Sequence, residues 1–481
     1  MDYEVVIGLE VHVHLGTRSK LFCPCRTDFG SPPNSQTCPV CLGLPGVLPV
    51  LNRVALEYAV RAGLALNCTI PPATKFDRKH YHYPDLPKNY QISQYDRPVA
   101  EHGRLEIEID GEPRTIGITR VHIEEDAGKL VHVEGARQSG VDLNRTGIPL
   151  IEIVSEPDIR SPQEARLYLE TLRRTMRYIG VSECSMEEGS LRCDANISVR
   201  RMGDVKLGTK VEIKNMNSFQ HVEDALAYEA RRQSAALENG GKIVQETRLY
   251  DADAGVTRSM RSKEEARDYR YFPEPDLPEF LLDAAWVDQI RASVGELPVA
   301  RKRRFVREYG LSDYDAGVLT SEKPVADFFE EIVKAGTDAK QACNWVAQDV
   351  LRALGERKVH IGGLKVKPAQ VAGLIKLIDA GVINNTIART RVFPRMVESG
   401  EDAGTIIEKE ALAQVSDSGA VEDACRKAIE GNPKAVDDFH GGKATAAHFL
   451  FGQAMKALGR KGNPQVVRET LDRLLNQIAG K

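Results

Sequence analysis

The feature that most limits how this chain can fold is a set of strand-like segments with one apolar face and one ligand-bearing face. Residues 5–15 read VVIGLEVHVHL, so the odd positions are apolar and Glu10, His12 and His14 share the other face. Side chains alternate across a strand, so this spacing separates the two sets. Residues 5–15 are therefore predicted to form a strand that buries one face.

The stretch 119–158 contains two further segments of this kind. A strand-like run over 120–123 ends in Glu124, Glu125 and Asp126, and an apolar run over 148–154 carries Glu152 in its middle. A carboxylate on an apolar strand is costly to bury unless it meets a cation or hydrogen-bond donors. Two interpretations stay open for Glu152: an edge strand with the carboxylate in water, or a built site.

Two more segments, 191–199 (LRCDANISV) and 211–215 (VEIKN), alternate in the same way. Their polar positions are Arg192, Asp194, Asn196, Ser198, Glu212 and Lys214. The solvated outer face of a sheet would alternate similarly. The residue types favour a site, because converging carboxylates suit Mg²⁺ that also holds phosphates.

Four cysteines lie close together in residues 22–46, FCPCRTDFGSPPNSQTCPVCLGLPG. Cys23 and Cys25 form one pair, and Cys38 and Cys41 form the other, across a loop rich in proline, glycine and asparagine. Two close pairs predict a tetrahedral structural zinc site, although C-x-C is less usual than C-x-x-C. The alternative is a loop with reduced, unliganded cysteines.

Basic and aromatic residues interleave over 75–91, KFDRKHYHYPDLPKNYQ. This mixture suits contacts to phosphates and bases. An exposed loop anchored by its tyrosines explains the segment almost as well. A glycine-rich segment at 203–210, GDVKLGTK, is not a phosphate loop, because Thr209 precedes Lys210 and the context is strand-turn-strand. Any ATP site must therefore use another scaffold.

Helices are predicted at 52–66, 161–179 and 219–237 among the strands, which indicates an α+β region. Strand signals end near residue 295, and helical patterns follow at 324–335, 338–354 and 368–380, with shorter helices from about 405. The predicted domains are 1–294, 295–404 and 405–481. A length of 481 residues agrees with about three domains.

Composition narrows the functional classes. A net charge of −4 confines any RNA-binding surface to a local patch. Nine cysteines, an odd number, without a secretory signal favour a reducing cytoplasm. No apolar run approaches the roughly 20 residues of a membrane span, so we expect no membrane association.

The motifs, taken together and in order, resemble those of the B-subunit family of the tRNA-dependent aspartyl/glutamyl-tRNA(Asn/Gln) amidotransferases. They are IGLEVHVHL, CPC with CPVC, KHYHYPDLPKNYQISQYD, HIEEDAGK, NRTGIPLIEIVSEPD, GSLRCDANISVR and KVEIKNMNSF. The resemblance runs the full length and is densest over 1–290. Seven motifs in order are far more specific than any one of them.

The resemblance implies a mainly antiparallel α+β cradle domain with a zinc-bearing loop, an all-α helical domain and a small all-α tail that contacts tRNA. It implies ATP-dependent phosphorylation of the side-chain carboxylate of misacylated glutamyl-tRNA(Gln) or aspartyl-tRNA(Asn), then amidation by ammonia. The implied partners in a heterotrimer are the A subunit, which is an amidase that releases ammonia from glutamine, and the small C subunit. A glutamyl- or aspartyl-tRNA synthetase is a further expected partner.

The residues and the resemblance together give an expected site. Glu10, Glu125 and Glu152 are expected to hold Mg²⁺ directly or through water, and the resemblance adds His12, although Mg²⁺ prefers oxygen ligands. The remaining expected residues are Lys79 and Lys88 for ATP phosphates, with Asp194, Lys214 and Asn215 completing the site. Catalytic roles are expected for Glu10, His12, Glu125, Glu152 and Asp194.

Two rival functions come from other classes. One is an ATP-dependent ligase that acts on a free small carboxylic acid, without RNA. The other is a zinc-ribbon scaffold that binds RNA and performs no chemistry. Acidic strand faces disfavour the scaffold, because carboxylates repel RNA phosphates unless a metal ion intervenes.

Overall fold

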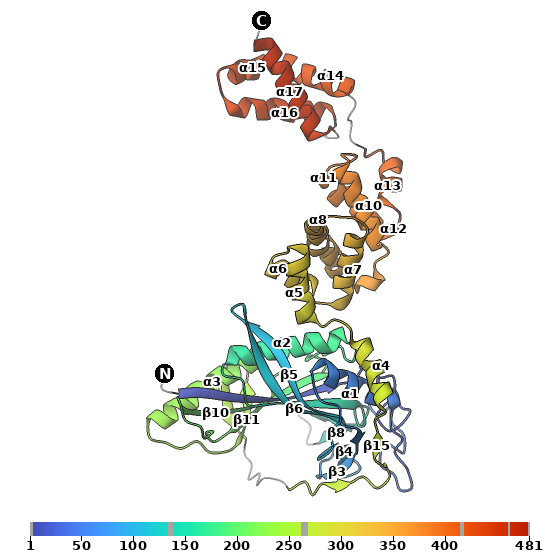
Figure 1. The fold of residues 1–481 in the computed structure, drawn as a ribbon, viewed down its shortest axis with the longest axis vertical. Coiled ribbons are helices and arrows are strands. Elements are labelled where there is room, and N and C mark those ends of the chain that lie inside the picture. Colours follow the sequence, from blue (N-terminus) through green and yellow to red (C-terminus); the bar gives the residue numbers. More distant parts are fainter. Residues whose placement is uncertain (1–2, 133–137, 261–267, 414–417, 460–461, 480–481) are drawn as a thin grey trace. The chain divides into compact units, whose positions relative to one another are not determined.

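The computed structural model describes residues 3–132, 138–260, 268–413, 418–459 and 462–479. The chain divides into two compact units, Met1–Arg301 and Lys302–Lys481. All strands of the described residues belong to the first unit, and the second unit is helical (Figure 1).

An eight-stranded sheet organises the first unit, in the order β13-β12-β11-β10-β1-β9-β6-β5. The strands are β1 (Tyr3–His14), β5 (Ala100–Ile109), β6 (Glu112–Glu125), β9 (Pro149–Ser155), β10 (Leu191–Arg201), β11 (Val211–Lys214), β12 (Thr247–Asp251) and β13 (Val256–Ser259). Strands β11 and β12 pair in parallel and the other neighbours are antiparallel, so the sheet is mixed. A helix connects the parallel pair, as is usual for such crossovers.

The alternation in β1 explains which face of the sheet is buried. Ile7, Leu9, Val11 and Val13 are fully buried, whereas Glu10 and His12 on the other face are half-buried. Burying an apolar side chain of this size stabilises the fold by about 1.5–3 kcal/mol. The apolar positions therefore decide which face of β1 receives the helices.

The helices that lie wholly within the described residues of this unit are α1 (Arg53–Ala65), α2 (Pro162–Tyr178), α3 (Phe219–Glu238) and α4 (Ala284–Val294). Helix α2 starts as predicted, with Pro162 in its first turn and the Ser161 side chain accepting from the Glu164 amide at 3.1 Å. Its buried stripe, including Leu169, Leu172 and Met176, joins the same core as β1. Figure 1 shows α2 lying along one face of the sheet.

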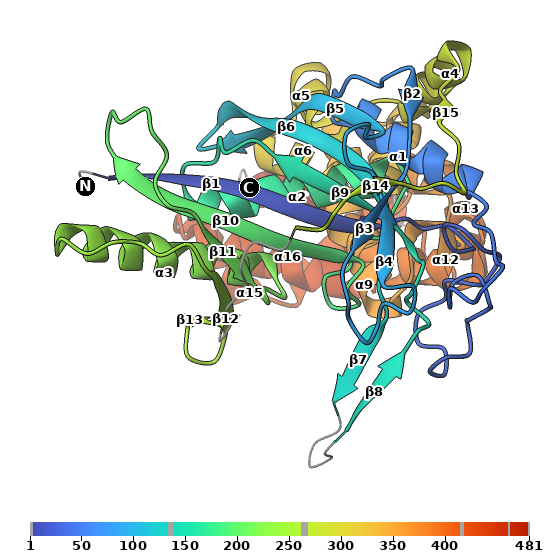
Figure 2. The same ribbon diagram turned by 90° about the horizontal axis from the view of Figure 1, so that it is seen from below.

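Small sheets complete the unit. Strand β4 (Tyr90–Ser93) pairs with β3 (Asp77–His80), which pairs with β14 (Phe272–Pro273), while β2 (Ala73–Thr74) pairs with β15 (Phe280–Leu281). Strands β7 (Lys129–His132) and β8 (Ser139–Asp142) form a hairpin that extends away from the large sheet (Figure 2). The 75–91 segment thus contains β3 and the start of β4, rather than only a loop.

The second unit holds two apolar clusters, one from Phe305 to Leu412 and one from Val421 to Leu475. The helices from Pro298 onward are α5 (Pro298–Tyr309), α6 (Asp313–Leu319), α7 (Lys323–Lys334), α8 (Ala339–Asn344), η1 (Trp345–Val350), α9 (Leu351–Arg357), η2 (Ile361–Gly363), α10 (Pro368–Asp379), α11 (Asn385–Ile387), η3 (Ala388–Val392), α12 (Phe393–Ser399), α13 (Ala403–Lys409), α14 (Ser418–Glu430), α15 (Pro433–His440), α16 (Ala444–Ala457) and α17 (Pro464–Ala479). The predicted helix over 338–354 is real, but π-helical geometry interrupts it at η1.

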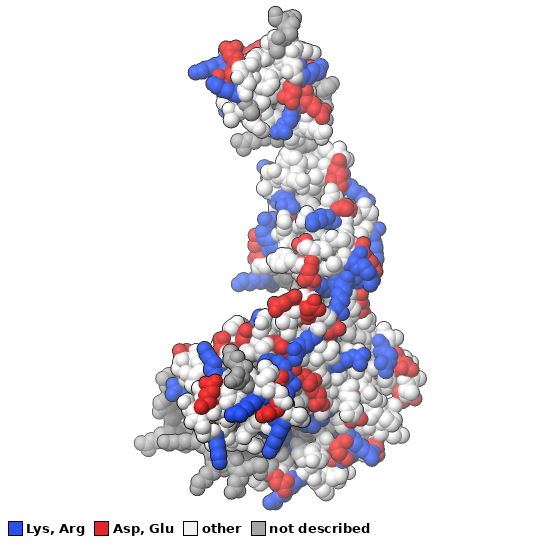
Figure 3. Space-filling view, turned by 60° about the vertical axis from the view of Figure 1, so that its left-hand side comes forward, with Lys and Arg blue, Asp and Glu red and all other residues white. Residues whose placement is uncertain are grey.

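The α+β prediction is confirmed, with a mixed sheet and a helical C-terminal region. Across the described residues, no helix combines the length and apolarity needed to cross a bilayer. On the face drawn in Figure 3, lysine and arginine side chains are interspersed with aspartate and glutamate. The division into cradle, helical and tail domains stays a prediction.

Candidate functional site

The register of the sheet lines up the polar positions of four strands. His12 on β1 lies opposite Arg192 on β10 and opposite Glu152 on β9. Glu152 in turn lies opposite His122 on β6. We call this surface, on the side of the sheet away from the β1 core, the polar face. The row across it is Arg192, His12, Glu152 and His122.

Three side chains of the polar face converge closely enough to share an ion. One ligand atom each from His12, Glu124 and Glu152 lies within 4.8 Å of the others. His12 Nε2 is 3.3 Å from Glu152 Oε2. Glu152 is 8% exposed and β9 is flanked by β1 and β6, so the interpretation of an edge strand with Glu152 in water is wrong.

Burial and charge compete at these carboxylates. Burial by itself raises the pKa of Glu152, but the imidazoles of His122 and His12 outweigh it and hold that pKa well below its usual range. Burial likewise opposes ionisation of Glu124, yet Lys79 and His122 lower its pKa to about 2. Both carboxylates are therefore ionised at neutral pH and available to a cation.

Lys79, predicted to bind ATP phosphates, interacts electrostatically with two carboxylates of this group, Glu124 and Glu152. Burial disfavours its charge, but Glu124 and other neighbours, including Glu152, raise the pKa of Lys79 above its ordinary value. Its ammonium also lies 5.0 Å from the centre of the Tyr269 ring. Lys79 therefore stays charged beside the carboxylates.

The titration of His122 is expected to make the unfolding free energy depend on pH, and this dependence can be measured in the absence of magnesium. Burial disfavours the imidazolium, but Glu152 and Glu124 raise the pKa of His122 to about 9, above the roughly 6.5 of an unfolded chain. The folded state binds this proton more tightly, so its stabilisation is complete below pH 6.5 and disappears as the pH rises through 9. We expect the unfolding free energy of the first unit to lose about 3 kcal/mol from this group over that range.

Urea unfolding at several pH values between 6 and 9.5 measures this loss. His122→Gln should have a flatter pH profile than the parent chain, because the glutamine does not titrate. Parallel profiles for the two chains would contradict the assignment.

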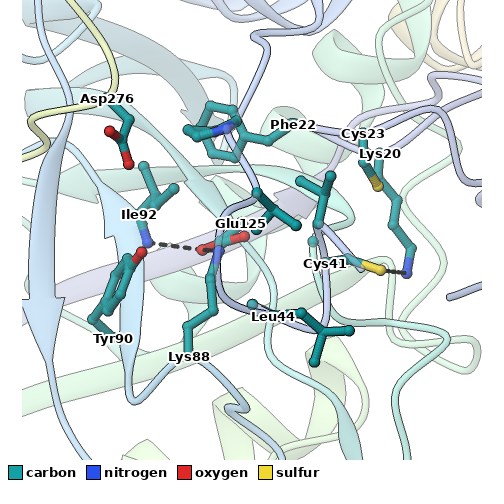
Figure 4. Close-up of a pocket in the computed structure, with 15 residues that line it drawn as sticks. Lys20, Phe22, Cys23, Cys41, Leu44, Lys88, Tyr90, Ile92, Glu125 and Asp276 are labelled. Carbon is teal, nitrogen blue, oxygen red and sulfur yellow. Dashed lines mark hydrogen bonds and ion pairs between the residues drawn. The ribbon is translucent and has the colours of Figure 1, made fainter. Parts of the chain in front are cut away.

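Glu125, predicted as a magnesium ligand, lies apart from the His12 group. It is buried at the end of β6, where it accepts from the Ile92 amide at 2.9 Å and pairs with the Lys88 ammonium. Figure 4 shows Glu125 and Lys88 on the wall of a cavity of about 100 Å³, beside the cysteine loop. The structure thus brings Lys88 to Glu125, and the metal role of Glu125 stays a prediction.

The other predicted residues extend the polar face along β1, β10 and β11. Glu10 lies opposite Asp194 and accepts from the Asn196 amide group at 2.9 Å. Burial, reinforced by Glu152, raises the pKa of Glu10. Lys214 is 2.7 Å from Asp194. Glu10 and Asp194 therefore lie one row along the sheet from His12.

Asn215 follows β11 with a φ of +68°. Its side chain donates to the Tyr250 carbonyl at 3.1 Å, so it holds β12 in this structure. The role of Asn215 in cofactor binding stays a prediction.

Sequence reasoning missed Glu124, His122 and Asp126. Asp126 is buried and lies 2.6 Å from His14 Nε2, 2.9 Å from Arg192 and 3.3 Å from Arg145. Alternation along β6 was the available signal, because it places His122 and Glu124 on one face and Glu125 on the other. Asp126 lies beyond the strand, so no such pattern marks it.

The four cysteines of the loop do come together. Ligand sulfurs of Cys23, Cys25, Cys38 and Cys41 all lie within 4.8 Å of one another. The Cys38 amide donates to Cys41 Sγ at 3.2 Å, a contact that favours a thiolate. A hydrogen bond with Cys23, helped by the Cys38 backbone and Lys20, lowers the pKa of Cys41 to about 4. Four sulfurs with a thiolate among them fit a tetrahedral metal site.

Comparison with known protein families covers most of the chain. The family model described as the GatB/GatE catalytic domain matches residues 5–288, and the GatB domain model matches residues 327–475. The first match contains the polar face and the cysteine loop. The second lies within the helical unit.

Individual relatives are similar over almost their full length, and each is named as the B subunit of an aspartyl/glutamyl-tRNA(Asn/Gln) amidotransferase. The Carboxydothermus hydrogenoformans protein is 55% identical over 473 residues, covering 98% of each chain. The Moorella thermoacetica protein is 54% identical over 473 residues, covering 98% of this chain and 99% of its own. The Caldicellulosiruptor bescii protein is 52% identical over 481 residues, covering 99% of this chain and 100% of its own.

Proposed function

Because the chain belongs to the B-subunit family of the aspartyl/glutamyl-tRNA(Asn/Gln) amidotransferases, we propose that it amidates misacylated tRNA with the use of ATP. The substrate is glutamyl-tRNA(Gln) or aspartyl-tRNA(Asn), and the product is correspondingly Gln-tRNA(Gln) or Asn-tRNA(Asn). The A subunit, an amidase, supplies ammonia from glutamine, and the small C subunit joins the two in a heterotrimer. A glutamyl- or aspartyl-tRNA synthetase supplies the misacylated tRNA.

The chemistry requires two balanced steps. A side-chain carboxylate oxygen of the aminoacyl group attacks the γ-phosphorus of ATP, the bond to the bridging oxygen breaks, and ADP leaves. The nitrogen of ammonia then attacks the acyl carbon, and the bond from this carbon to the phosphate oxygen breaks. The phosphate leaves with the former carboxylate oxygen and takes up the proton that the nitrogen loses. Phosphorylation is needed because a free carboxylate is a poor acyl donor.

The observation that carries the proposal is the convergence of His12, Glu124 and Glu152, with the half-buried cation Lys79 beside them. These three side chains fit a Mg²⁺ ion, which supplies charge neutralisation during phosphoryl transfer. Lys79 offsets negative charge on the transferred group, and Lys88 remains a proposed phosphate contact. Glu10 and Asp194 lie opposite each other in the next row of the polar face, where Lys214 pairs with Asp194.

A cleft of about 940 Å³ adjoins the polar face, with His14, Lys129, Arg145 and Arg192 on its wall. Its volume is at the upper end of the range for small-molecule sites, and arginine suits phosphate recognition. We assign the acyl-bearing end of the tRNA to this cleft. The cysteine loop holds a structural Zn²⁺, and the helical tail contacts the tRNA body.

The test is ATP hydrolysis by the chain purified with its partner subunits, with and without Mg²⁺. Glutamyl-tRNA(Gln), uncharged tRNA and free glutamate are compared as stimulants. We expect charged tRNA alone to stimulate hydrolysis, because its carboxylate is the phosphoryl acceptor. Equal stimulation by free glutamate would favour a ligase for small acids, and the absence of hydrolysis under all conditions would favour an RNA-binding scaffold.

A further inference from the structure

Lys20 is among the most deeply buried charged side chains in the described residues, with 1% of its surface exposed. Its ammonium donates to the Gln36 carbonyl at 2.8 Å and approaches Cys41 Sγ at 3.6 Å and the Leu143 carbonyl at 3.4 Å. Figure 4 shows the side chain reaching toward the Cys41 sulfur. The ammonium of Lys20 is therefore held between the cysteine loop, residues 22–46, and the segment at Leu143.

In the described part of the chain Lys20 forms no ion pair with a carboxylate, so the sulfur of Cys41, 3.6 Å away, is the group that can balance its charge. A buried ammonium without a negative partner is strongly destabilising. A divalent ion held by four thiolates carries a net charge of about −2, which supplies the missing partner. Neutral thiols would leave the ammonium unbalanced.

Lys20 also joins two segments of the chain at this point. The Lys20 amide donates to the Cys25 carbonyl at 2.9 Å, and the next amide, of Leu21, donates to the Gly147 carbonyl at 2.9 Å. Gly147 has a φ of +84°, and a Cβ built on it would lie 3.5 Å from Lys20 Cδ and 3.6 Å from Cys41 Cβ. The turn before β9 is thus packed directly against Lys20 and the cysteine loop.

We propose that Lys20 is a positioning residue of the cysteine metal centre, whose ammonium offsets the excess negative charge of the metal thiolates and ties them to the turn at 143–147. The inference rests on the proposed zinc site and adds a residue to it. Lys20 touches no substrate. Its role is to retain the ion and to keep the cysteine loop in place.

The test measures zinc release from the full chain to a coloured chelator, together with zinc content. Lys20→Met removes the charge and keeps the length of the side chain. Groups that support metal ligands typically affect metal affinity by 10–100-fold, so we expect Lys20→Met to release zinc about 10–100-fold faster. The matched control is Lys75→Met, since Lys75 pairs with Asp77 and Asp96 instead.

If Lys20→Met does not fold, two further variants distinguish the role of the charge from that of the hydrogen bonds. Lys20→Arg keeps the positive charge, whereas Lys20→Gln removes the charge and can still donate hydrogen bonds. Arginine should release zinc at nearly the parent rate, and glutamine about 10–100-fold faster. Parent-like release from the glutamine variant would overturn the role of Lys20 while leaving the zinc site intact. A parent chain without zinc would overturn both proposals.

Discussion

Replacing Glu152 with glutamine is expected to lower tRNA-stimulated ATP hydrolysis by on the order of 10²–10³-fold. Glu152 lies at the centre of the row, 3.3 Å from His12 and 3.4 Å from His122, with Glu124 beside it. The amide keeps the shape of the side chain but removes a buried negative charge and an anionic oxygen ligand. The maximal rate of ATP hydrolysis should fall, and added Mg²⁺ should restore this rate only in part.

Glu170→Gln on α2 is the matched control, because Glu170 pairs with Arg166 on the helix surface. It should hydrolyse ATP at the parent rate, and thermal unfolding should show all variants folded. Full activity of Glu152→Gln at the parent Mg²⁺ requirement would remove Glu152 from the site.

Glu124→Gln and Glu125→Gln distinguish two ligand sets for the magnesium ion. If the ion is held as the geometry suggests, Glu124→Gln should lose about as much activity as Glu152→Gln. Dominant loss in Glu125→Gln, with a raised Mg²⁺ requirement, would instead support the ligand set predicted from the sequence.

The second large effect is expected from Cys41→Ser, which should reduce bound zinc from about one ion per chain to almost none. Cys41 is buried, and its sulfur lies with those of Cys23, Cys25 and Cys38. Apparent binding free energies at structural zinc sites are on the order of 10 kcal/mol, so losing the ion should loosen the loop over 22–46. Elemental analysis measures the zinc, and limited proteolysis measures the order of the loop.

Cys68→Ser is the control for the cysteine substitution itself. Cys68 is also buried, but it lies outside the four-cysteine group. This variant should keep its zinc and its protease resistance, although it places a hydroxyl in the core. Zinc retained by Cys41→Ser at the parent level would exclude a four-cysteine site.

Local patterns were enough to predict most of the strands and helices that carry the site, although not β3, which carries Lys79. Alternation of apolar and polar residues identified β1, β9, β10 and β11, because successive side chains point to opposite faces and only one face of each strand packs against the core. Capping residues predicted the start of α2, since Ser161 satisfies a free backbone amide of the first turn. The close spacing of the cysteine pairs predicted their cluster, because short connections leave few other arrangements.

The partners of each polar side chain were decided only by the tertiary structure. The sequence placed a carboxylate on β9, but the register of β1, β9 and β6 puts His12 and His122 on either side of Glu152. The register of a strand pair depends on the burial of a whole sheet face and on the turns between distant strands. The sequence of one strand alone therefore does not predict it.

The same reason accounts for Glu124 and Lys20. Adjacent acids at the end of β6 look equivalent in the sequence, yet one faces His12 and the other Lys88. Lys20 looks like a surface lysine until the turn at 143–147, more than a hundred residues away, packs against it. The sequence by itself thus determined which residue types were available on each strand face. Long-range packing decided which of them meet, because charge and burial act through distances in space.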